Sequence, residues 1–175
     1  DALLARGKKV ECLDSGAIRR TINRSLGFSR DEIESNLNRL AYDASMLNRN
    51  GVIAVVSAVS PYRSVRDSIR EASPGFVEVY CRCSMEVLVS RDSSGLFDRA
   101  QRGEVQHVAG IDAPYEEPLK PEVLLNTDAE APDDCAGKVI ATLELLGRIE
   151  QQESPCYTAA EEELIKQRLQ DLGYL

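Results

Sequence analysis

Polar side chains that could bind a ligand follow two apolar runs of the sequence. Asp14 comes directly after residues 8–13, and Ser60 and Arg63 follow residues 52–59. Both runs are typical of strands, and in open α/β sheets ligands bind just beyond the carboxyl ends of the strands. An arginine offers a planar fork of N–H donors to the oxygens of a phosphate or sulfate group. A simpler interpretation, which the sequence leaves open, is that these residues only begin the turn and the helix that follow.

Composition narrows the class of partner. The chain carries a net charge of −8, which argues against non-specific nucleic-acid binding, because such binding depends on neutralised phosphates. Local arginine clusters still permit a small anionic ligand. No apolar run approaches the roughly 20 residues of a membrane helix, and no secretory signal opens the chain. The five cysteines lack a metal-ligand spacing and suit buried, reduced thiols, so we expect a cytoplasmic protein without membrane contact.

The apolar run at residues 52–59 organises the predicted fold. Almost every side chain in it is apolar, without alternation, which is typical of a central strand that is buried on both faces of a parallel sheet. Pro61 follows and removes a backbone donor, which ends the strand. Strands alternate with helices along the rest of the chain, and this order predicts βαβ units. We therefore expect an α/β fold, with a parallel sheet flanked by helices.

Caps and periodicity place the other elements. Further strands are expected at residues 8–13, 76–83 and 122–127. Helices are expected at residues 30–49, behind a capping box formed by Ser29 and Glu32, and at residues 61–72, 84–89, 96–101 and 133–149, the last capped by Asp133 or Asp134. Residues 104–119 show no clear period. A loop of this length inside a compact domain favours a functional role or a lid.

The beginning of the chain carries its own prediction. Residues 1–7 match the last turns of a helix that stops at Gly7. We therefore expect one more strand of the sheet upstream of Asp1. The alternative is an N-terminal helix of about two turns, which would be only marginally stable alone. Residues 1–149 would then form one α/β domain whose first part lies outside this sequence.

The end of the chain is expected to be a separate segment. Residues 150–175 would form a polar linker and an amphipathic helix that begins with a capping box at Thr158. Its apolar stripe would comprise Leu164, Ile165, Arg168, Leu169 and Leu172. A single helix cannot bury such a stripe alone, so it would dock on this domain, on a second copy of the chain or on a partner.

Several short motifs, each weak alone, occur in an order and at a spacing that resemble one enzyme family. They are Leu13-Asp14-x-x-x-Ile18-Arg19, Leu26-Gly27-Phe28-Ser29, Asn36 with Arg39, Ser60-Pro61-Tyr62-Arg63, Arg91-Asp92-x-x-Gly95-Leu96 and Gly110-Ile111-Asp112-x-Pro114-Tyr115-Glu116-x-Pro118. Together, over residues 7–149, they resemble adenylylsulfate kinase, which phosphorylates the ribose 3′ position of adenosine 5′-phosphosulfate (APS).

The resemblance implies a P-loop kinase fold. It also implies ATP and Mg²⁺ as cofactors and transfer of the ATP γ-phosphate to APS, which makes 3′-phospho-APS (PAPS) in sulfate assimilation. The family's glycine-rich phosphate loop, GxxxxGK[ST], does not occur in residues 1–175. With the first strand, that loop would lie upstream of Asp1.

The resemblance also implies roles for residues that match the family's motifs. Asp14 would contact Mg²⁺ or the acceptor hydroxyl, and Arg91 and Gly95 would lie near the ATP base. The loop at residues 104–118 would be a lid that excludes water. The residues expected to hold APS are Arg19, Phe28, Asn36, Arg39, Ser60, Gly110, Ile111 and Asp112.

The chain departs from the family pattern at five positions. The family's Asp-Gly-Asp is Asp14-Ser15-Gly16 here, so its second carboxylate is missing. Ile33 and Asn38 replace arginines, Ser94 replaces a lysine, and Val108 replaces the lid aromatic expected to stack on the APS base. We expect these changes to weaken APS binding and Mg²⁺ placement, unless Arg20, Arg24 or His107 compensates.

Three functions therefore compete. The first is an APS kinase, or a kinase of a related nucleotide, acting as a homodimer or with a fused or partnered ATP sulfurylase. The second is a catalytically impaired module that binds APS or PAPS and regulates such a sulfurylase. The third is a degenerate domain used for assembly, with the C-terminal helix as its connector.

Overall fold

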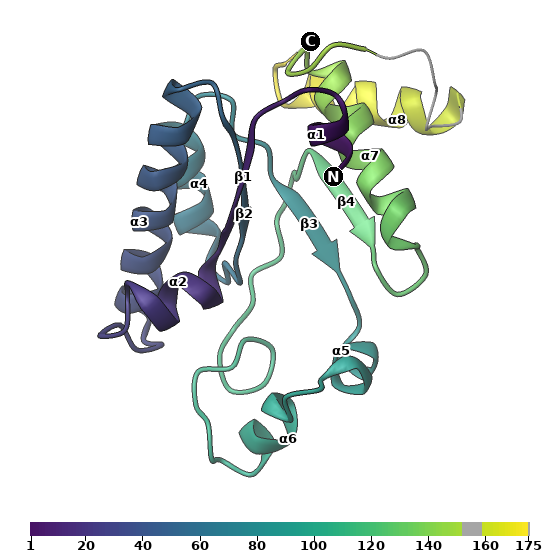
Figure 1. Ribbon diagram of the computed structural model, residues 1–175. Coiled ribbons are helices and arrows are strands. Elements are labelled where there is room, and N and C mark those ends of the chain that lie inside the picture. Colours follow the sequence, from purple (N-terminus) through teal and green to yellow (C-terminus); the bar gives the residue numbers. More distant parts are fainter. Residues whose placement is uncertain (152–158, 175) are drawn as a thin grey trace. The chain divides into compact units, whose positions relative to one another are not determined.

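The structure, a computed structural model, describes residues 1–151 and 159–174 (Figure 1). Its strands are β1 (Val10–Asp14), β2 (Ile53–Ser57), β3 (Val79–Arg82) and β4 (Val123–Asn126). Its helices are α1 (Ala2–Ala5), α2 (Ser15–Thr21), α3 (Arg30–Arg49), α4 (Arg63–Ala72), α5 (Met85–Arg91), α6 (Leu96–Gln101), α7 (Pro132–Leu145) and α8 (Ala159–Asp171). Strands and helices alternate along the chain, which confirms the predicted α/β class.

The chain forms two compact units. The first is built mainly from residues 3–74 and 89–117, and the second from residues 75–88 and from residue 118 onward. Each unit holds one pair of parallel strands, β1 with β2 and β3 with β4. The prediction of parallel strands is confirmed, but the described strands form two separate pairs where the sequence predicted one sheet.

The core of the first unit lies between the β1–β2 pair and the helices that cover it. In Figure 1, α3 runs along this pair with α4 beside it. The buried centre comprises Leu37, Leu40, Tyr62 and Val65, with Leu13, Ile18, Ile33 and Ile69 packed against it. α3 begins at the predicted capping box of Ser29 and Glu32.

The expectation that residues 52–59 are buried on both faces is wrong. Val55 is 44% exposed, Val56 is 42% exposed and Val59 is 68% exposed. Within its unit β2 pairs only with β1 among the described strands, and helix α3 packs against it. The apolar composition of β2 indicated that both of its faces should be covered by other residues. Within the described part of the unit, other residues cover it only in part. Cys12 and Cys81, expected to be buried, are exposed as well.

Two helix starts differ from the predictions for local reasons. α4 begins at Arg63 after Tyr62, and not at Pro61. α7 begins at Pro132 with Ala131 as its N-cap residue, so neither Asp133 nor Asp134 caps it. Proline suits the first helical position because its missing N–H would be unpaired there. α7 also ends at Leu145, four positions before the predicted end.

The C-terminal helix docks within its own unit. Leu169 is 0% exposed, and the Tyr174 hydroxyl lies 3.5 Å from the Phe76 carbonyl. The predicted stripe is only partly correct, because Leu164 is 63% exposed. Thr158 and its capping box lie outside the described residues.

Along the described ranges, no helix combines the length and the apolar character that a membrane span requires.

The burial of Leu169 gives a stability prediction. Leu169→Ala should lower the free energy of unfolding by about 2–5 kcal/mol, because it leaves a cavity beneath α8. Leu164→Ala is the matched control on the same helix, and its exposed side chain should change stability by less than about 0.5 kcal/mol. Urea unfolding followed by circular dichroism measures both. Equal losses in the two variants would show that α8 is not docked through Leu169.

Candidate functional site

Asp14 lies at the carboxyl end of β1 and begins α2. Its Oδ1 atom accepts a hydrogen bond of 2.6 Å from the Ala17 backbone N–H, so Asp14 caps the helix. In the parallel register Asp14 is opposite Ser57, at the same edge of the β1–β2 pair. The side chain is exposed, and this is the edge where α/β proteins bind ligands. The simpler interpretation, that Asp14 begins the helix that follows, is therefore correct. Its other carboxylate oxygen, Oδ2, could still bind a ligand.

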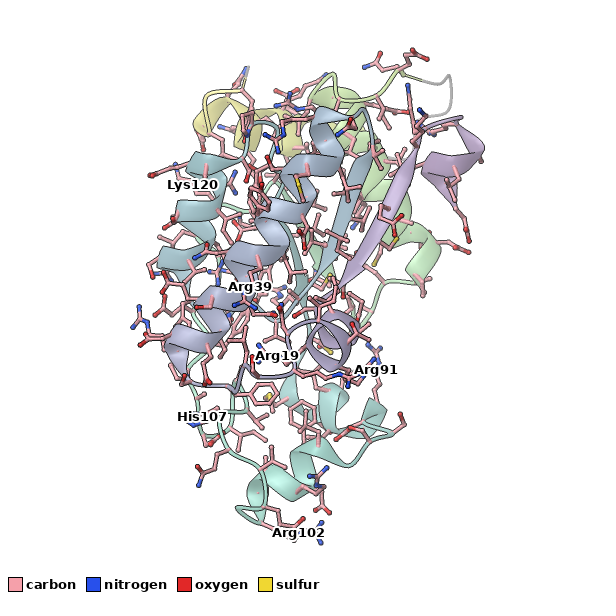
Figure 2. The ribbon with its side chains drawn as sticks, turned by 60° about the vertical axis from the view of Figure 1, so that its left-hand side comes forward. Arg19, Arg39, Arg91, Arg102, His107 and Lys120 are labelled. Carbon is pink, nitrogen blue, oxygen red and sulfur yellow. The ribbon has the colours of Figure 1, made fainter. Side chains whose placement is uncertain are left out.

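A chain of four polar side chains joins α2, the turn after it and α3. Arg39 donates to Asn23 Oδ1 (2.7 Å), Asn23 Nδ2 donates to Asn36 Oδ1 (2.9 Å), and Asn36 Nδ2 donates to Ser15 Oγ (3.0 Å). Asn23 and Asn36 are 2% and 1% exposed, whereas Arg39 is exposed. Figure 2 labels Arg39 on α3 and Arg19 on α2. The structure thus links two predicted site residues, Asn36 and Arg39, through a third that the sequence analysis missed.

Arg19 and Phe28 form a second group. The Arg19 guanidinium carbon lies 4.6 Å from the centre of the Phe28 ring, a cation–π contact. The same guanidinium donates to the carbonyl of Leu26, at 3.1 Å, and to that of Gly27. Phe28 is 53% exposed, so part of its ring still faces solvent. The sequence predicted that both residues contact one ligand, and the structure places them against each other.

The carboxylate of Glu32 shapes the loop that presents Phe28. It accepts hydrogen bonds from the Gly27 N–H (2.9 Å), the Ser29 N–H (3.1 Å) and the Ser29 hydroxyl (2.6 Å). The Ser29 hydroxyl and these two backbone N–H groups hold the pKa of Glu32 below its ordinary value. A Cβ atom at Gly27 would lie 2.7 Å from the Glu32 carboxylate. Any other residue at this position would therefore displace the group that holds the loop.

Ser60 lies where the long loop at residues 104–118 returns to the strand end. Arg66, only 7% exposed, donates to the Ser60 carbonyl (2.5 Å) and to the Glu116 carbonyl (2.6 Å). The Glu116 carboxylate accepts from the Arg63 N–H (2.8 Å), and the Glu116 N–H donates to the Pro61 carbonyl (2.8 Å). The buried Ser60 Oγ has no hydrogen-bond partner among the described residues. The base of the loop is thus fixed beside an available hydroxyl.

Asp112 folds the tip of this loop. Its carboxylate accepts from the backbone N–H groups of His107 (2.7 Å) and Val108 (2.6 Å). His107 has a φ of 64°, which is uncommon for a residue with a side chain and is compatible with this tight turn. Those two N–H groups lower the pKa of Asp112. The predicted segment Gly110, Ile111 and Asp112 is therefore a compact turn that Asp112 stabilises from within.

The segment predicted to lie near the ATP base is another carboxylate-centred turn. Arg91 ends α5, and Gly95 precedes α6 with a φ of 67°, a conformation that glycine adopts without strain. The Asp92 carboxylate accepts from the Ser94 hydroxyl (2.7 Å), the Ser94 N–H (2.9 Å) and the Phe97 N–H (2.9 Å). These bonds lower the pKa of Asp92. Ser94, one of the five departures, is thus part of the turn.

Two other departures have become packing residues. Ile33 packs against the core of the first unit, and Val108 is 9% exposed inside the lid turn. At Gly16, an added Cβ would lie 3.2 Å from Asp14 Oδ1, so a larger side chain would crowd the cap. Asn38 is exposed and, with Arg39, lines a shallow hollow of about 420 Å³ between α2 and α3. The hollow is also lined by Ile18, Ile22, Asn23, Tyr42 and Asp43.

Two of the residues that could compensate for the five departures, Arg24 and His107, make local contacts. Arg24 donates through Nε to the Arg20 carbonyl at 2.7 Å, so it stabilises the end of α2. His107 contributes its backbone N–H to the lid turn.

Four residues of this region had no site role in the sequence analysis. Asn23 and Arg66 gave no sequence signal, because a single amide or guanidinium is compatible with an exposed surface. Glu32 was recognised only as part of a capping box, and Glu116 only as part of a motif. What distinguishes these four residues is that each is buried or takes part in several hydrogen bonds. The spacing of residues along the sequence does not reveal either property.

The residues present are compatible with Mg²⁺ that is held mainly by nucleotide phosphates. No group of three or more His, Cys, Asp or Glu side chains suited to a metal occurs among the described residues. Mg²⁺ in nucleotide sites commonly takes one or two carboxylates and completes its shell with water and phosphate oxygens. Asp14, with one carboxylate oxygen outside its helix cap, can supply one such ligand.

The lowered pKa of Asp112 gives a pH prediction. Because its folded pKa lies below the unfolded value, its stabilisation of the turn is fully present above the unfolded pKa. That stabilisation is lost as the pH falls through the folded pKa. The amide proton shifts of His107 and Val108 should titrate together below the ordinary value of 3.8. In Asp112→Asn this shared titration should disappear. A midpoint above 3.8 in the unmodified chain would contradict the assignment.

The contacts of Glu116 give a prediction for the loop at residues 104–118, which we propose to be a lid. Glu116→Ala removes the acceptor of the Arg63 N–H, so amide hydrogen exchange in residues 104–118 should become about tenfold faster. Glu117→Ala is the matched control, because the neighbouring Glu117 side chain is exposed. Mass spectrometry of peptides that cover the loop measures both variants. An unchanged exchange rate in Glu116→Ala would mean that other contacts hold the lid.

Comparisons with known proteins agree on one family. The sequence profile described as "Adenylylsulphate kinase" matches residues 1–126. An adenylyl-sulfate kinase from Microcystis aeruginosa is 40% identical over 149 residues, which cover 85% of this chain and 82% of that protein. A probable bifunctional SAT/APS kinase from Sorangium cellulosum is 41% identical over 147 residues, which cover 84% of this chain but only 25% of that longer protein.

Solved structures give the same result. The APS kinase of Mycobacterium tuberculosis, in complex with AMPPNP and APS, is 34% identical and superimposes with a TM-score of 0.77 over 82% of this chain and 84% of its own. A hexameric APS kinase from Thiobacillus denitrificans is 28% identical, with a TM-score of 0.60 over 86% of this chain and 26% of its own. The sequence matches and this fold together show that the chain belongs to the adenylylsulfate kinase family of enzymes.

Proposed function

We propose that this chain provides the APS-binding site of an APS kinase. In the reaction, the 3′-oxygen of APS forms a bond to the γ-phosphorus of ATP, the bond from that phosphorus to the β–γ bridging oxygen breaks, and ADP leaves. The hydroxyl proton passes to solvent or to a nearby carboxylate. The observation that carries the proposal is the hydrogen-bonded chain from Arg39 through Asn23 and Asn36 to Ser15, the residue that follows Asp14 at the carboxyl end of β1.

The roles of the residues follow from their chemistry. Arg19 and Arg39 would bind the sulfate and phosphate oxygens, and the exposed face of Phe28 would stack on the purine. Asp14 would contact the acceptor hydroxyl or a Mg²⁺ ligand shell. When bound with ATP, Mg²⁺ neutralises charge that develops on the β- and γ-phosphates. The reaction needs positioning more than a strong base.

The lid would close the site from one side. Its base is fixed to the end of β2 through Arg66 and Glu116, so the segment can hinge without losing its anchor. Ser60 Oγ, Gly110 and Ile111 would then meet the substrate as the lid excludes water. Asp112 would act indirectly, because its carboxylate already holds the turn.

The site for ATP would include the turn between α5 and α6. Arg91 and Gly95 would lie near the adenine. The similarity to a solved APS kinase that binds AMPPNP and APS supports this proposal.

A partner that makes APS would suit this reaction. We propose that the protein acts as a homo-oligomer or together with an ATP sulfurylase. The bifunctional name of the Sorangium relative and the hexameric Thiobacillus kinase support this proposal.

A second function has one observation in its favour. In this chain the Asn36 amide donates to Ser15, which stands where the family has glycine, and Gly16 stands where the family has its second carboxylate. A nucleotide-binding module without turnover would keep Arg19, Arg39 and the Phe28 ring while losing that second carboxylate. Binding and turnover must therefore be measured separately.

Calorimetry and phosphotransfer assays together test both functions. APS should bind the full-length protein and, with Mg²⁺ and labelled ATP, should yield labelled PAPS. Arg19→Ala should weaken APS binding about tenfold or more, because it removes a charged contact. Arg49→Ala, at the exposed end of α3, is the control. Binding without product would favour the nucleotide-sensing module, and no binding at high APS concentration would refute both.

A further inference from the structure

The polar chain between Arg39 and Ser15 depends on one residue in its middle. Asn23 accepts from Arg39 and donates to Asn36 with the two ends of a single amide, at 2.7 and 2.9 Å. It is 2% exposed, so it is shielded from solvent while the guanidinium beside it is exposed. The backbone of Asn23 is fixed as well, because its N–H donates to the Ile18 carbonyl at 3.0 Å. Its side chain is therefore a rigid acceptor for a cation at the surface.

We infer that Asn23 is a positioning residue that holds Arg39 in the orientation needed to meet an anionic group of the nucleotide. The inference rests on the proposed function, since the anion is taken to be the phosphosulfate of APS. Asn23 itself would not touch the substrate. It would act through Arg39, and through Asn36 it would keep α3 in register with the start of α2.

Only an amide of this size performs both tasks. The substitution Asn23→Asp would keep an acceptor for Arg39 but would remove the N–H donor to Asn36, and Asn23→Ala would remove both groups. All donors in the chain point the same way, from Arg39 toward Ser15, so each amide is polarised by the next. Loss of the middle residue would separate the two ends of the chain.

Arg39 has an alternative partner if Asn23 is removed. Asp43 lies one helical turn further along α3, and both residues line the hollow beside Asn23. Side chains four positions apart on a helix can form an ion pair. Without the Asn23 acceptor, the guanidinium would sample this pairing and other rotamers. An anionic ligand would then meet a mobile or neutralised cation.

Affinity measurements give the first test. By calorimetry, Asn23→Ala should weaken APS binding about tenfold, which is the expected scale for a misplaced charged contact, and should leave binding of neutral adenosine unchanged. In an Arg39→Ala background the same substitution should have no further effect on APS affinity. Asn48→Ala, an exposed asparagine on α3, is the control. A similar loss with and without Arg39, or an equal loss for adenosine, would overturn the inference and indicate a merely structural role.

A ligand-free measurement separates this inference from the proposed function. ¹⁵N relaxation of the Arg39 Nε–H group should show an ordered side chain in the unmodified chain, a mobile one in Asn23→Ala and an ordered one in Asn23→Asp, which keeps the acceptor. Asn23→Asp also serves if Asn23→Ala fails to fold. A mobile Arg39 in the unmodified chain overturns the inference even if APS binds. If Arg39 is ordered by Asn23 but APS does not bind, the proposed function fails and the assignment of the anion fails with it.

Discussion

The parallel register of β1 and β2 positions most of the candidate site. It sets Asp14 opposite Ser57, so the segments that leave both strands begin at the same edge of the pair. From one strand the chain enters α2 and the turn that carries Asn23. From the other it continues through Ser60 to the anchored base of the lid. A shift of one residue in this pairing would move the side chains of one strand to the opposite face of the sheet. It would also separate these segments.

Three loops of the first unit share one design, in which a carboxylate that is not buried binds backbone N–H groups. Glu32 holds the loop of Phe28, Asp92 holds the turn before α6, and Asp112 holds the tip of the lid. The pKa of each carboxylate is lowered by those bonds. Because all three shifts have the same sign, protonation of these carboxylates in acid would weaken the hydrogen bonds of all three loops.

The features that the sequence predicted well are those with a local cause. The Ser29 capping box, the glycine stop at residue 7 and the short helix at residues 96–101 each depend on neighbouring residues. What it missed depends on contacts between distant segments. Asn23 gains its role only because α3 brings Asn36 and Arg39 to it, and Arg66 only because the lid returns to Ser60. The exposed valines of β2 are a further example, since the apolar composition of a strand does not show which other strands and helices will pack against it.

The order of the chain through the two units has a consequence for synthesis on the ribosome. The strands of the second unit, β3 and β4, are separated by a segment of about 40 residues, most of which belongs to the first unit. β3 must therefore leave the ribosome and wait, unpaired, until the lid and β4 have been made. The first unit is likewise incomplete until residue 117 has emerged. The second unit cannot pair its strands before the whole of the first unit has been translated, so a nascent chain paused between β3 and β4 would expose an unpaired, β-forming strand to its neighbours.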